Sequence, residues 1–550
     1  MRNDSLNKLF ESSIREHWNS PALSNCEGET LLYSDVGRHT VMLQHLFAGC
    51  GVEPGSRVAI CSRNQAAWGV AFLAVMSAGA VPVPILSDFR PGSIHYLVNH
   101  SESKLLFAGS AILEELDPAR MPDLAAIIRI EDFEVVHTSN SDISGRLAAA
   151  LREFHRKYPR GVAPEDVVFH KDSPEDLALI NYTSGTSGFA KGVMLPYRSL
   201  LFNIELIHRV APQLDCNSNV VSMLPLAHMY GMTMDFIFEM TIGAHVHFLM
   251  RPPSPTVIKE TFARIRPDII MTVPLVIEKI CRKVMAETGC TPEAENLTQE
   301  QKKKACDALT TIFGGRFSEV MVGGAPMNRQ IEDFLAAIGF RYTVGSGMTE
   351  CGPLVSLSSC KEIKPHTCGK RAFYSDIRID SPDAANIPGE VYIRGGNLFL
   401  GYLKMPERTA EVLSADGWFR TGDIGTLDAD GFLSLRGRCT SMILNSAGQN
   451  IFPEEIESSI NTLPYVQESL VVADGNRLVA LIVPDRESAA AAGLAGETLN
   501  RALKDEVMTL NGELPTYCNI AQVEVREQEF EKTPKNSIKR YLYDRQTKTI

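Results

Sequence analysis

The amino-acid sequence predicts an α/β protein: a large N-terminal domain of parallel-sheet layers with a small β-barrel-like part, followed by a small α+β domain. Between residues 30 and 110, short apolar runs typical of buried strands alternate with longer runs typical of helices. Such alternation builds parallel sheets covered by helices on both faces. Near residues 385–440 the pattern changes to short β segments. The 550 residues also exceed the roughly 250–300 residues that one core usually serves.

The N-terminal elements follow one another along the chain. Residues 31–52, LLYSDVGRHTVMLQHLFAGCGV, predict a strand and then an amphipathic helix that ends in Gly51. RVAICS (57–62) predicts a buried strand, and QAAWGVAFLAVMSAGAVPVPI (65–85) predicts a buried helix that runs into another strand. The strand pattern resumes in LLFAGS, DLALINYTSGTSG, VVSMLPLAH, AHVHFL, DIIMTV and EVMVGG.

The β-rich part and a compact tail complete the predicted domains. GEVYIRGG (389–396) and GWFRTGDIGTLDADGFLSLRGR (417–438) contain short β elements. In the tail, EEIESSINTL and LNRALKDEVMTL predict helices, whereas QESLVVAD, RLVALIVPD and AQVEVRE predict strands. A unit of about 110 residues is large enough to fold alone. We therefore predict a boundary near Gly437–Thr440, with domains 1–437 and 438–550.

The composition excludes several classes of protein. The formal net charge is −12, and an acidic chain lacks the basic face that a nucleic-acid binder needs. The twelve cysteines include no C-x-x-C pair, which favours structural thiols over a zinc site. The sequence contains no run of ~18 apolar residues and no apolar region typical of a signal peptide. We expect a cytoplasmic protein without a transmembrane segment, and peripheral membrane contact stays open.

The stretch NYTSGTSGFAKGVMLPYRS (Asn181–Ser199) combines hydroxyl residues, glycines and a lysine after a strand-like run. Backbone N–H groups of a Gly-rich turn, together with side-chain hydroxyls and the Lys191 ammonium, suit a phosphate site. The alternative is a flexible polar loop with one solvated lysine. The stretch lacks the Walker A pattern, because Ala190 precedes the lysine and Gly192 follows it.

Five further segments follow in a fixed order: LPLAHMYG (Leu224–Gly231), GGAP (Gly323–Pro326), GSGMTE (Gly345–Glu350), GWFRTGDIG (Gly417–Gly425) and GRCTSMILNSAGQNIFPEEIE (Gly437–Glu457). Together with the loop, they resemble the ordered motifs of the adenylate-forming superfamily, which includes acyl-CoA synthetases, luciferases and peptide-synthetase adenylation domains. The chain looks most like bacterial long-chain fatty acyl-CoA synthetases. The resemblance extends over nearly the whole sequence.

The resemblance implies a reaction in two halves. A carboxylate attacks the α-phosphorus of ATP to give an acyl-adenylate and pyrophosphate, and the thiol of CoA then displaces AMP. Because both partners of the first step are anions, catalysis depends on electrostatics and positioning. The implied small molecules are a medium- or long-chain fatty acid, ATP, Mg²⁺ and CoA. The small C-terminal domain is implied to be mobile and to rotate between the two steps.

The resemblance also assigns roles to individual residues. Glu350 would hold Mg²⁺, Thr349 would bond the α-phosphate, and Asp423 would accept hydrogen bonds from the ribose hydroxyls. A histidine such as His228 in an apolar stretch is often a core residue, but in the family it lies beside the acyl carboxylate. The catalytic candidates are Lys191, His228, Thr349, Glu350 and Lys535. The candidates for binding nucleotide or CoA are Thr183, Ser184, Gly185, Thr186, Ser187, Gly188, Lys191, Gly324, Ala325, Pro326, Gly345, Ser346, Gly347, Met348, Thr349, Asp423, Arg438 and Gly448.

The sequence departs from the family pattern at three places. The hinge has Thr440 or Ser441 where Asp or Lys is usual, and Ser346 stands where an aromatic residue usually stacks on adenine. In KTPKNSIKR, Ser537 replaces the lysine that bridges the acyl carboxylate and the α-phosphate. Lys535 and Lys539 lie two residues away on either side, and such side chains share a face of an extended chain. One of them is a possible substitute; otherwise adenylation is expected to be slow.

Three functions stay open at this point. The first is an ATP-dependent acyl-CoA ligase that acts on a fatty acid. The second loads the acyl-adenylate onto the phosphopantetheine of a separate carrier protein. The third is a nucleotide or acyl-adenylate binder with little turnover. The sequence predicts neither the acyl chain length nor the oligomeric state.

Overall fold

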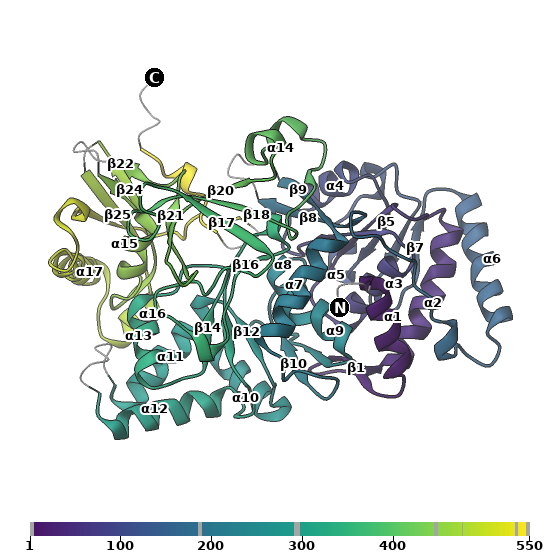
Figure 1. Cartoon of the computed structure of the whole chain (residues 1–550), viewed down its shortest axis with the longest axis horizontal. Coiled ribbons are helices and arrows are strands. Elements are labelled where there is room, and N and C mark those ends of the chain that lie inside the picture. Colours follow the sequence, from purple (N-terminus) through teal and green to yellow (C-terminus); the bar gives the residue numbers. More distant parts are fainter. Residues whose placement is uncertain are drawn as a thin grey trace.

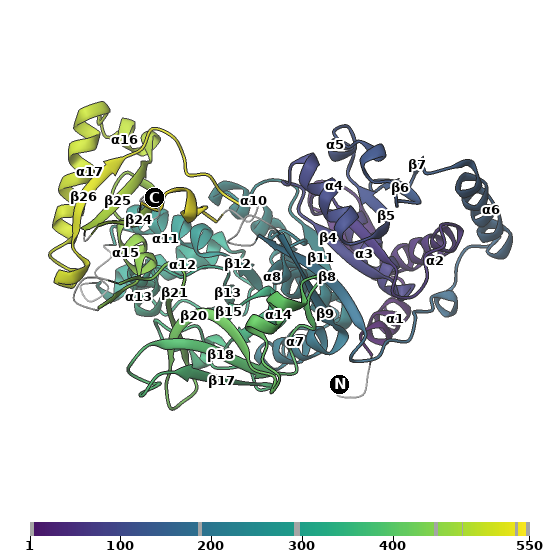
Figure 2. The same ribbon diagram turned by 90° about the horizontal axis from the view of Figure 1, so that it is seen from above.

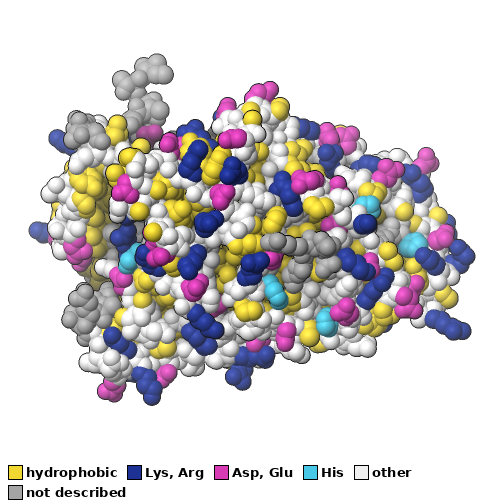
Figure 3. Space-filling view, viewed as in Figure 1, with side chains coloured by type: hydrophobic (Ala, Val, Ile, Leu, Met, Phe, Trp, Pro, Cys, Tyr) yellow, Lys and Arg dark blue, Asp and Glu magenta, His cyan; other side chains and the backbone are white. Residues whose placement is uncertain are grey.

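The computed structural model describes residues 5–184, 190–290, 297–444, 449–475, 477–533 and 537–545. In Figure 1 the elements follow the colour order of the chain from the purple N-terminal layers to the yellow C-terminal unit. In these residues we find no helix that is both long and apolar enough to span a bilayer. On the face shown in Figure 3, acidic and basic side chains are interspersed, and no large field of one charge is visible.

The first sheet has the strand order β4-β3-β5-β6-β7. The four strands β3 (Arg57–Cys61), β4 (Val81–Ile85), β5 (Ser103–Ala108) and β6 (Ala126–Arg129) are parallel, and β7 (Val135–Thr138) is antiparallel to β6. The helix α3 (Ala66–Ser77) is apolar except for Ser77 at its end and buried except for the partly buried Ala67, as expected of a helix packed on nearly every side. The strand and helix predicted over 57–85 are therefore confirmed.

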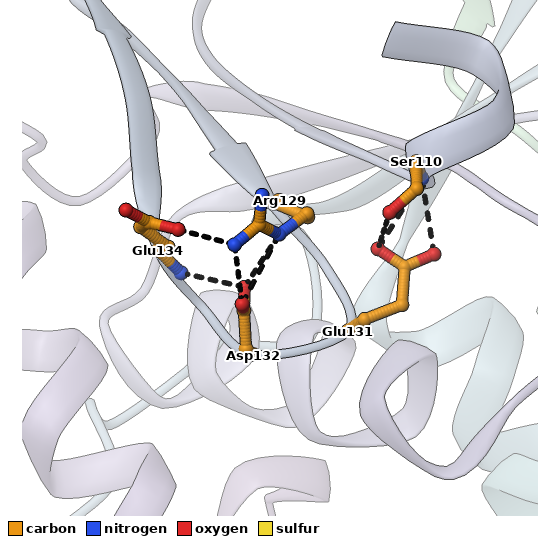
Figure 4. A network of polar contacts seen from close by, with 5 residues as sticks. All are labelled: Ser110, Arg129, Glu131, Asp132 and Glu134. Atoms are coloured by element: carbon orange, nitrogen blue, oxygen red, sulfur yellow. Dashed lines mark hydrogen bonds and ion pairs between the residues drawn. The ribbon is translucent and has the colours of Figure 1, made fainter.

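Polar contacts join the loops that follow β5 and β6 (Figure 4). The Glu131 carboxylate accepts from the backbone N–H of Ser110 at 3.0 Å and from its hydroxyl at 3.1 Å. The Arg129 guanidinium donates to Asp132 (Nε–Oδ1, 3.0 Å) and also contacts Glu134. These exposed pairs hold the turn between β6 and β7, and each contributes little to stability.

Three further sheets lie in the large N-terminal part, besides the β-rich sheet and the two-stranded sheet of β15 (Ser346–Gly347) and β16 (Leu354–Ser356). One has the order β10 (Asn219–Ser222), β11 (His245–Phe248), β1 (Pro21–Asn25) and β2 (Thr30–Leu32), and the three strands β12 (Ile270–Thr272), β13 (Val320–Val322) and β14 (Tyr342–Val344) are parallel. The third has β8 (Leu177–Ser184), β9 (Ala190–Pro196) and β19 (Gly401–Tyr402). This third sheet is antiparallel, contrary to the parallel pattern expected, because only residues 185–189 separate β8 from β9, too few for the crossover that a parallel pair needs.

Helices cover these sheets and enclose three apolar cores, one of which gathers around Val83, Leu97 and Leu106. Trp68 stacks on Phe72 with ring centroids 5.5 Å apart, and Phe236 packs against both rings. A second core gathers around Phe262 and Phe313. The remaining N-terminal helices of more than five residues are α1 (Leu6–Glu16), α2 (Tyr33–Gly49), α4 (Pro91–His100), α6 (Ser141–Lys157), α7 (Tyr197–Val210), α10 (Pro255–Ile265), α11 (Pro274–Thr288), α12 (Gln299–Ile312), α13 (Arg329–Ala337) and α14 (Pro406–Val412).

The β-rich part is a four-stranded antiparallel sheet in the order β17-β18-β20-β21. Its strands are β17 (Ser375–Asp380), β18 (Gly389–Gly395), β20 (Phe419–Leu427) and β21 (Leu433–Arg438). The small C-terminal unit then comprises α15 (Pro453–Ile460), β24 (Val466–Asp474), β25 (Arg477–Pro484), α16 (Arg486–Ala491), α17 (Gly496–Leu510) and β26 (Ile520–Val525). The α/β fold with a large N-terminal and a small C-terminal part is confirmed.

The C-terminal unit lies at the end of the molecule opposite α2 and α6 (Figure 2). It contacts the N-terminal part through α15 and the turn after it. The Arg282 guanidinium donates to the carbonyls of Asn461 (3.2 Å) and Thr462 (3.0 Å), and Asn328 Nδ2 donates to the Ser458 carbonyl at 3.0 Å. The boundary between domains 1–437 and 438–550 stays a prediction.

Candidate active site

The predicted phosphate loop connects the two strands of a β-hairpin. Thr183 on β8 lies opposite Lys191 on β9. A strand follows the loop, whereas a Walker A loop leads directly into a helix, so the local fold agrees with the absence of that motif. The predicted residues Gly185, Thr186, Ser187 and Gly188 lie outside the described residues, and only the backbone of Ser184 is described.

Two more predicted motifs meet at the carboxyl ends of neighbouring parallel strands. Gly324, Ala325 and Pro326 follow β13, and Gly345 follows β14, with its N–H donating to the Val322 carbonyl at 2.9 Å. Gly324 has a φ of +89°, which an L side chain adopts only with strain. Ligands of α/β proteins bind at this edge of a sheet. The structure therefore brings the two motifs together where a nucleotide is expected.

The LPLAHMYG segment lies between the hairpin and β13. Asn181 Nδ2 on β8 donates to the Ala227 carbonyl at 2.9 Å, and the Tyr230 hydroxyl donates to the Met321 carbonyl at 2.9 Å. His228 caps the helix α8 (Met229–Met232), where its Nδ1 accepts from the Tyr230 N–H at 3.3 Å. The half-buried imidazole thus has a structural role in the fold, and its place beside an acyl carboxylate stays a prediction.

Thr349 and Glu350 lie in a 3₁₀ turn (Thr349–Cys351) and are nearly buried; Glu350 is 9% exposed. The Glu350 Oε1 atom accepts a hydrogen bond of 2.9 Å from the hydroxyl of Tyr402, which is 5% exposed. The ammonium of Lys191 lies 4.8 Å from the centroid of the same Tyr402 ring. Burial and the Glu350 charge raise the pKa of Tyr402, so the phenol remains a donor.

Sequence reasoning missed Tyr402, although its side chain connects two predicted site residues. The only local signal is the Gly401–Tyr402 pair at the end of the apolar run NLFL. Such a pair is common in loops and indicates no particular chemistry. The partners of Tyr402 are distant in the sequence, so the contact becomes visible only in three dimensions.

The implied magnesium ion fits the residues present. Mg²⁺ keeps several waters and usually takes only one or two carboxylates plus substrate phosphates. Glu350 supplies one carboxylate beside the candidate phosphate lysine. Among the described residues, no group of three or more His, Cys, Asp or Glu residues is arranged to hold a metal. One carboxylate beside a lysine is compatible with a magnesium ion completed by substrate phosphates and water, and the metal role of Glu350 stays a prediction.

Asp423, the predicted ribose residue, forms an ion pair with the binding candidate Arg438 across the β-rich sheet. Asp423 on β20 and Arg438 on β21 are register partners, and Arg438 Nε lies 3.0 Å from Asp423 Oδ1. Burial raises the pKa of Asp423, and the Arg438 charge opposes the shift. Ser346, Gly347 and Asp423 help to line one crevice of about 10 Å³, which has room for about one water. The crevice must widen to take a nucleoside.

Among the residues that the structure describes, Ser537 forms hydrogen bonds only with Thr533 of the same C-terminal hairpin. The Thr533 N–H donates to the Ser537 carbonyl at 2.8 Å, and the Ser537 N–H donates to the Thr533 hydroxyl at 3.3 Å. Lys539 Nζ is 3.0 Å from the Glu531 carboxylate, so this possible substitute is ion-paired. The other candidate, Lys535, lies outside the described residues, as does Gly448 of the thiol-acceptor loop.

The hinge segment is a hydrogen-bonded turn. The N–H groups of Ser441 and Met442 donate to the Arg438 carbonyl at 3.2 Å and 3.1 Å, and the Ser441 hydroxyl bonds to the Glu454 carboxylate. These contacts attach the end of β21 to the first turn of α15. These contacts are local, but a rotation about this turn would also break the hydrogen bonds of Arg282 and Asn328 to α15 and the turn after it.

Comparison with known proteins agrees with this arrangement. Residues 10–403 match the family model described as AMP-binding enzyme, and residues 440–549 match that of the AMP-binding enzyme C-terminal domain. The chain is 27% identical over 473 residues to the long-chain-fatty-acid–CoA ligase FadD15 of Mycobacterium bovis, covering 80% of this chain and 74% of that protein.

The solved structures that are similar in fold include the following two. One is the anthranilate CoA ligase AuaEII in complex with anthranoyl-AMP (TM-score 0.77, 19% identity, 98% of this chain and 96% of that chain). The other is ATP-bound MatB from Rhodopseudomonas palustris (TM-score 0.74, 20% identity, 98% of each chain).

The chain is therefore an enzyme of the adenylate-forming class. It belongs to the AMP-binding enzyme family, whose model covers most of its length.

Proposed function

We propose that the protein is an ATP-dependent acid–thiol ligase that joins a carboxylic acid to CoA. The main support for this proposal is the position of four predicted motifs that are far apart in the sequence. The phosphate-loop strands, LPLAHMYG, GGAP and GSGMTE lie around the β8–β9 hairpin and the carboxyl ends of β13 and β14. The M. bovis relative is named a long-chain-fatty-acid–CoA ligase, which favours a fatty acid as the substrate. We further propose that this fatty acid has a medium or long chain.

In the first step a carboxylate oxygen forms a bond to the α-phosphorus of ATP, and the bond from that phosphorus to the bridging oxygen of pyrophosphate breaks. Lys191 would donate to the leaving phosphates. Thr349 would donate to the α-phosphate, where negative charge accumulates in the transition state. A Mg²⁺ ion held by Glu350 would screen the phosphate charges. Such fixed donors are effective because they need no reorganisation during the reaction.

In the second step the sulfur of CoA forms a bond to the acyl carbon, the acyl–AMP bond breaks, and the thiol proton passes to solvent. Asp423 would hold the ribose of the leaving AMP, and Arg438 would keep that carboxylate oriented through its 3.0 Å contact. The loop around Gly448 would present backbone to the pantetheine arm. A carrier protein as acceptor stays the alternative within the same chemistry.

A second candidate is favoured by one specific observation. Ser537 supplies no charge where two anions must approach, and its described contacts are confined to its own hairpin. This supports a nucleotide or acyl-adenylate binder with slow turnover.

The test is an ATP-dependent thioester assay over a panel of carboxylic acids. We expect AMP release that requires both a fatty acid and free CoA. Release only with a carrier protein would support the alternative acceptor, and absence of release with every acid would support the binder.

A further inference from the structure

Residues 397–403 form a segment that connects two parts of the candidate site. On one side, the Leu403 N–H donates to the carbonyl of Gly192, directly after the phosphate lysine, at 2.8 Å. On the other side, the Phe399 N–H donates to the Glu350 carbonyl at 2.9 Å. The segment therefore fixes the spacing between the strand that carries the lysine and the turn that carries the carboxylate.

Tyr402 is the side chain of this segment that contacts both functional groups. Its hydroxyl donates to Glu350 Oε1 at 2.9 Å, and its ring centroid lies 4.8 Å from Lys191 Nζ. The hydroxyl thus touches the candidate metal ligand, and the ring touches the candidate phosphate ligand. No other contact between described residues joins these two groups through a single side chain.

The ring has little freedom to move. The Tyr402 backbone pairs with Val193 on β9, and its N–H donates to the Thr409 hydroxyl at 2.9 Å. The ring of Phe399 packs edge-on against it, with centroids 5.0 Å apart. A buried side chain that is held from three sides can orient its own partners.

The two contacts suit the two partners chemically. A phenol O–H that donates to one carboxylate oxygen fixes the plane of the carboxylate, and such partners of a metal ligand tune metal affinity. An aromatic face attracts an ammonium group without cancelling its charge, unlike a carboxylate partner. The ring also offers no oxygen acceptor to the ammonium group. The N–H donors of the lysine therefore stay suited to the oxygens of a triphosphate.

We propose that Tyr402 is a positioning residue of the nucleotide site, whose hydroxyl orients Glu350 toward the metal–triphosphate complex and whose ring orients Lys191 toward the phosphates. The inference rests on the proposed function, because it requires that the site binds ATP with a divalent cation. It adds a residue that neither the sequence motifs nor the comparisons assign.

The test separates the two contacts with two variants. Tyr402→Phe keeps the ring and removes the hydroxyl, and Tyr402→Leu removes both. Mn²⁺ binding to the protein–ATP complex is measured by electron paramagnetic resonance, and ATP binding at saturating Mn²⁺ by calorimetry. We expect Tyr402→Phe to weaken Mn²⁺ binding about tenfold with little change in ATP affinity. Tyr402→Leu should in addition weaken ATP binding about fivefold.

Tyr33→Phe is the matched control, because the buried Tyr33 hydroxyl donates to the Ala244 carbonyl at 2.8 Å, with a longer contact to the Met240 sulfur at 3.9 Å, in a different part of the core. It should leave both affinities unchanged. If wild type binds Mn²⁺ and ATP but Tyr402→Phe binds them equally well, the positioning role is wrong while the proposed function stands. If Tyr33→Phe loses as much Mn²⁺ affinity as Tyr402→Phe, the positioning role of Tyr402 is also wrong. If wild type binds no ATP, the proposed function fails, and this inference with it.

Discussion

The candidate nucleotide site and the C-terminal hairpin use similar side chains in opposite ways. In the site, the Lys191 ammonium lies over the Tyr402 ring, where its charge is available to an anion. In the hairpin, Lys532 is 2.8 Å from Glu468 and Lys539 is 3.0 Å from Glu531, so each charge is balanced within the protein. The first arrangement is prepared for a ligand, and the second mainly holds the hairpin in place.

This difference suggests that nucleotide binding and the adenylation step depend on different parts of the chain. Of the residues predicted to hold ATP, Lys191 and Glu350 lie around one tyrosine ring, whereas the C-terminal residue predicted to meet the two reacting anions is a serine. Nucleotide affinity and the rate of adenylation should therefore respond to different substitutions. The first two of the following variants test this separation and the third tests a buried carboxyl group, in order from the largest expected effect to the smallest.

Lys191→Ala should reduce the adenylation rate most. Loss of one preorganised donor to a developing charge typically costs about 10²–10³-fold in rate. The measurement is pyrophosphate release at saturating fatty acid. Lys404→Ala is the control, because Lys404 is exposed and pairs with Glu102 at 2.7 Å. Equal activity of Lys191→Ala and wild type would remove Lys191 from the site.

Ser537→Lys should increase the adenylation rate about tenfold, because a charge-assisted hydrogen bond to the reacting anions contributes ~1.5–3 kcal/mol. ATP affinity should change far less. Gln522→Lys places the same charge on an exposed position of the same unit and serves as the control. An unchanged or lower rate of pyrophosphate release in Ser537→Lys would show that the serine does not limit the reaction.

Glu239→Gln should have a small effect that depends on pH. Burial and the neighbouring Asp235 carboxyl raise the pKa of Glu239 well above its ordinary value. The folded protein keeps a proton that the unfolded chain loses above about pH 4.3, so this contribution to the free energy of unfolding is lost as pH rises. We expect Glu239→Gln to raise the melting temperature at pH 8 by about 2 °C and to bring no gain at pH 4. A gain of equal size at both pH values would contradict this explanation.

Much of the site was predictable because its residues follow strands. GGAP and GSGMTE come directly after apolar runs, and parallel strands bring such loops to one edge. The Asp423–Arg438 pair was harder to predict, since it depends on the register of β20 and β21. Tyr402 was missed because neither a motif nor a periodicity distinguishes it. The antiparallel β8–β9 hairpin was missed because an apolar run does not reveal the direction of its partner strand.

The most direct test of the account is ATP affinity, measured by calorimetry with Mg²⁺, for wild type and Asp423→Asn. An ionised carboxylate that accepts from ribose hydroxyls should contribute about 1.5–3 kcal/mol, so we expect saturable binding by wild type and at least about tenfold weaker binding by the variant. If wild type binds no ATP, or if the variant binds ATP as tightly as wild type, the central claim that the candidate site binds the nucleotide through Asp423 is contradicted.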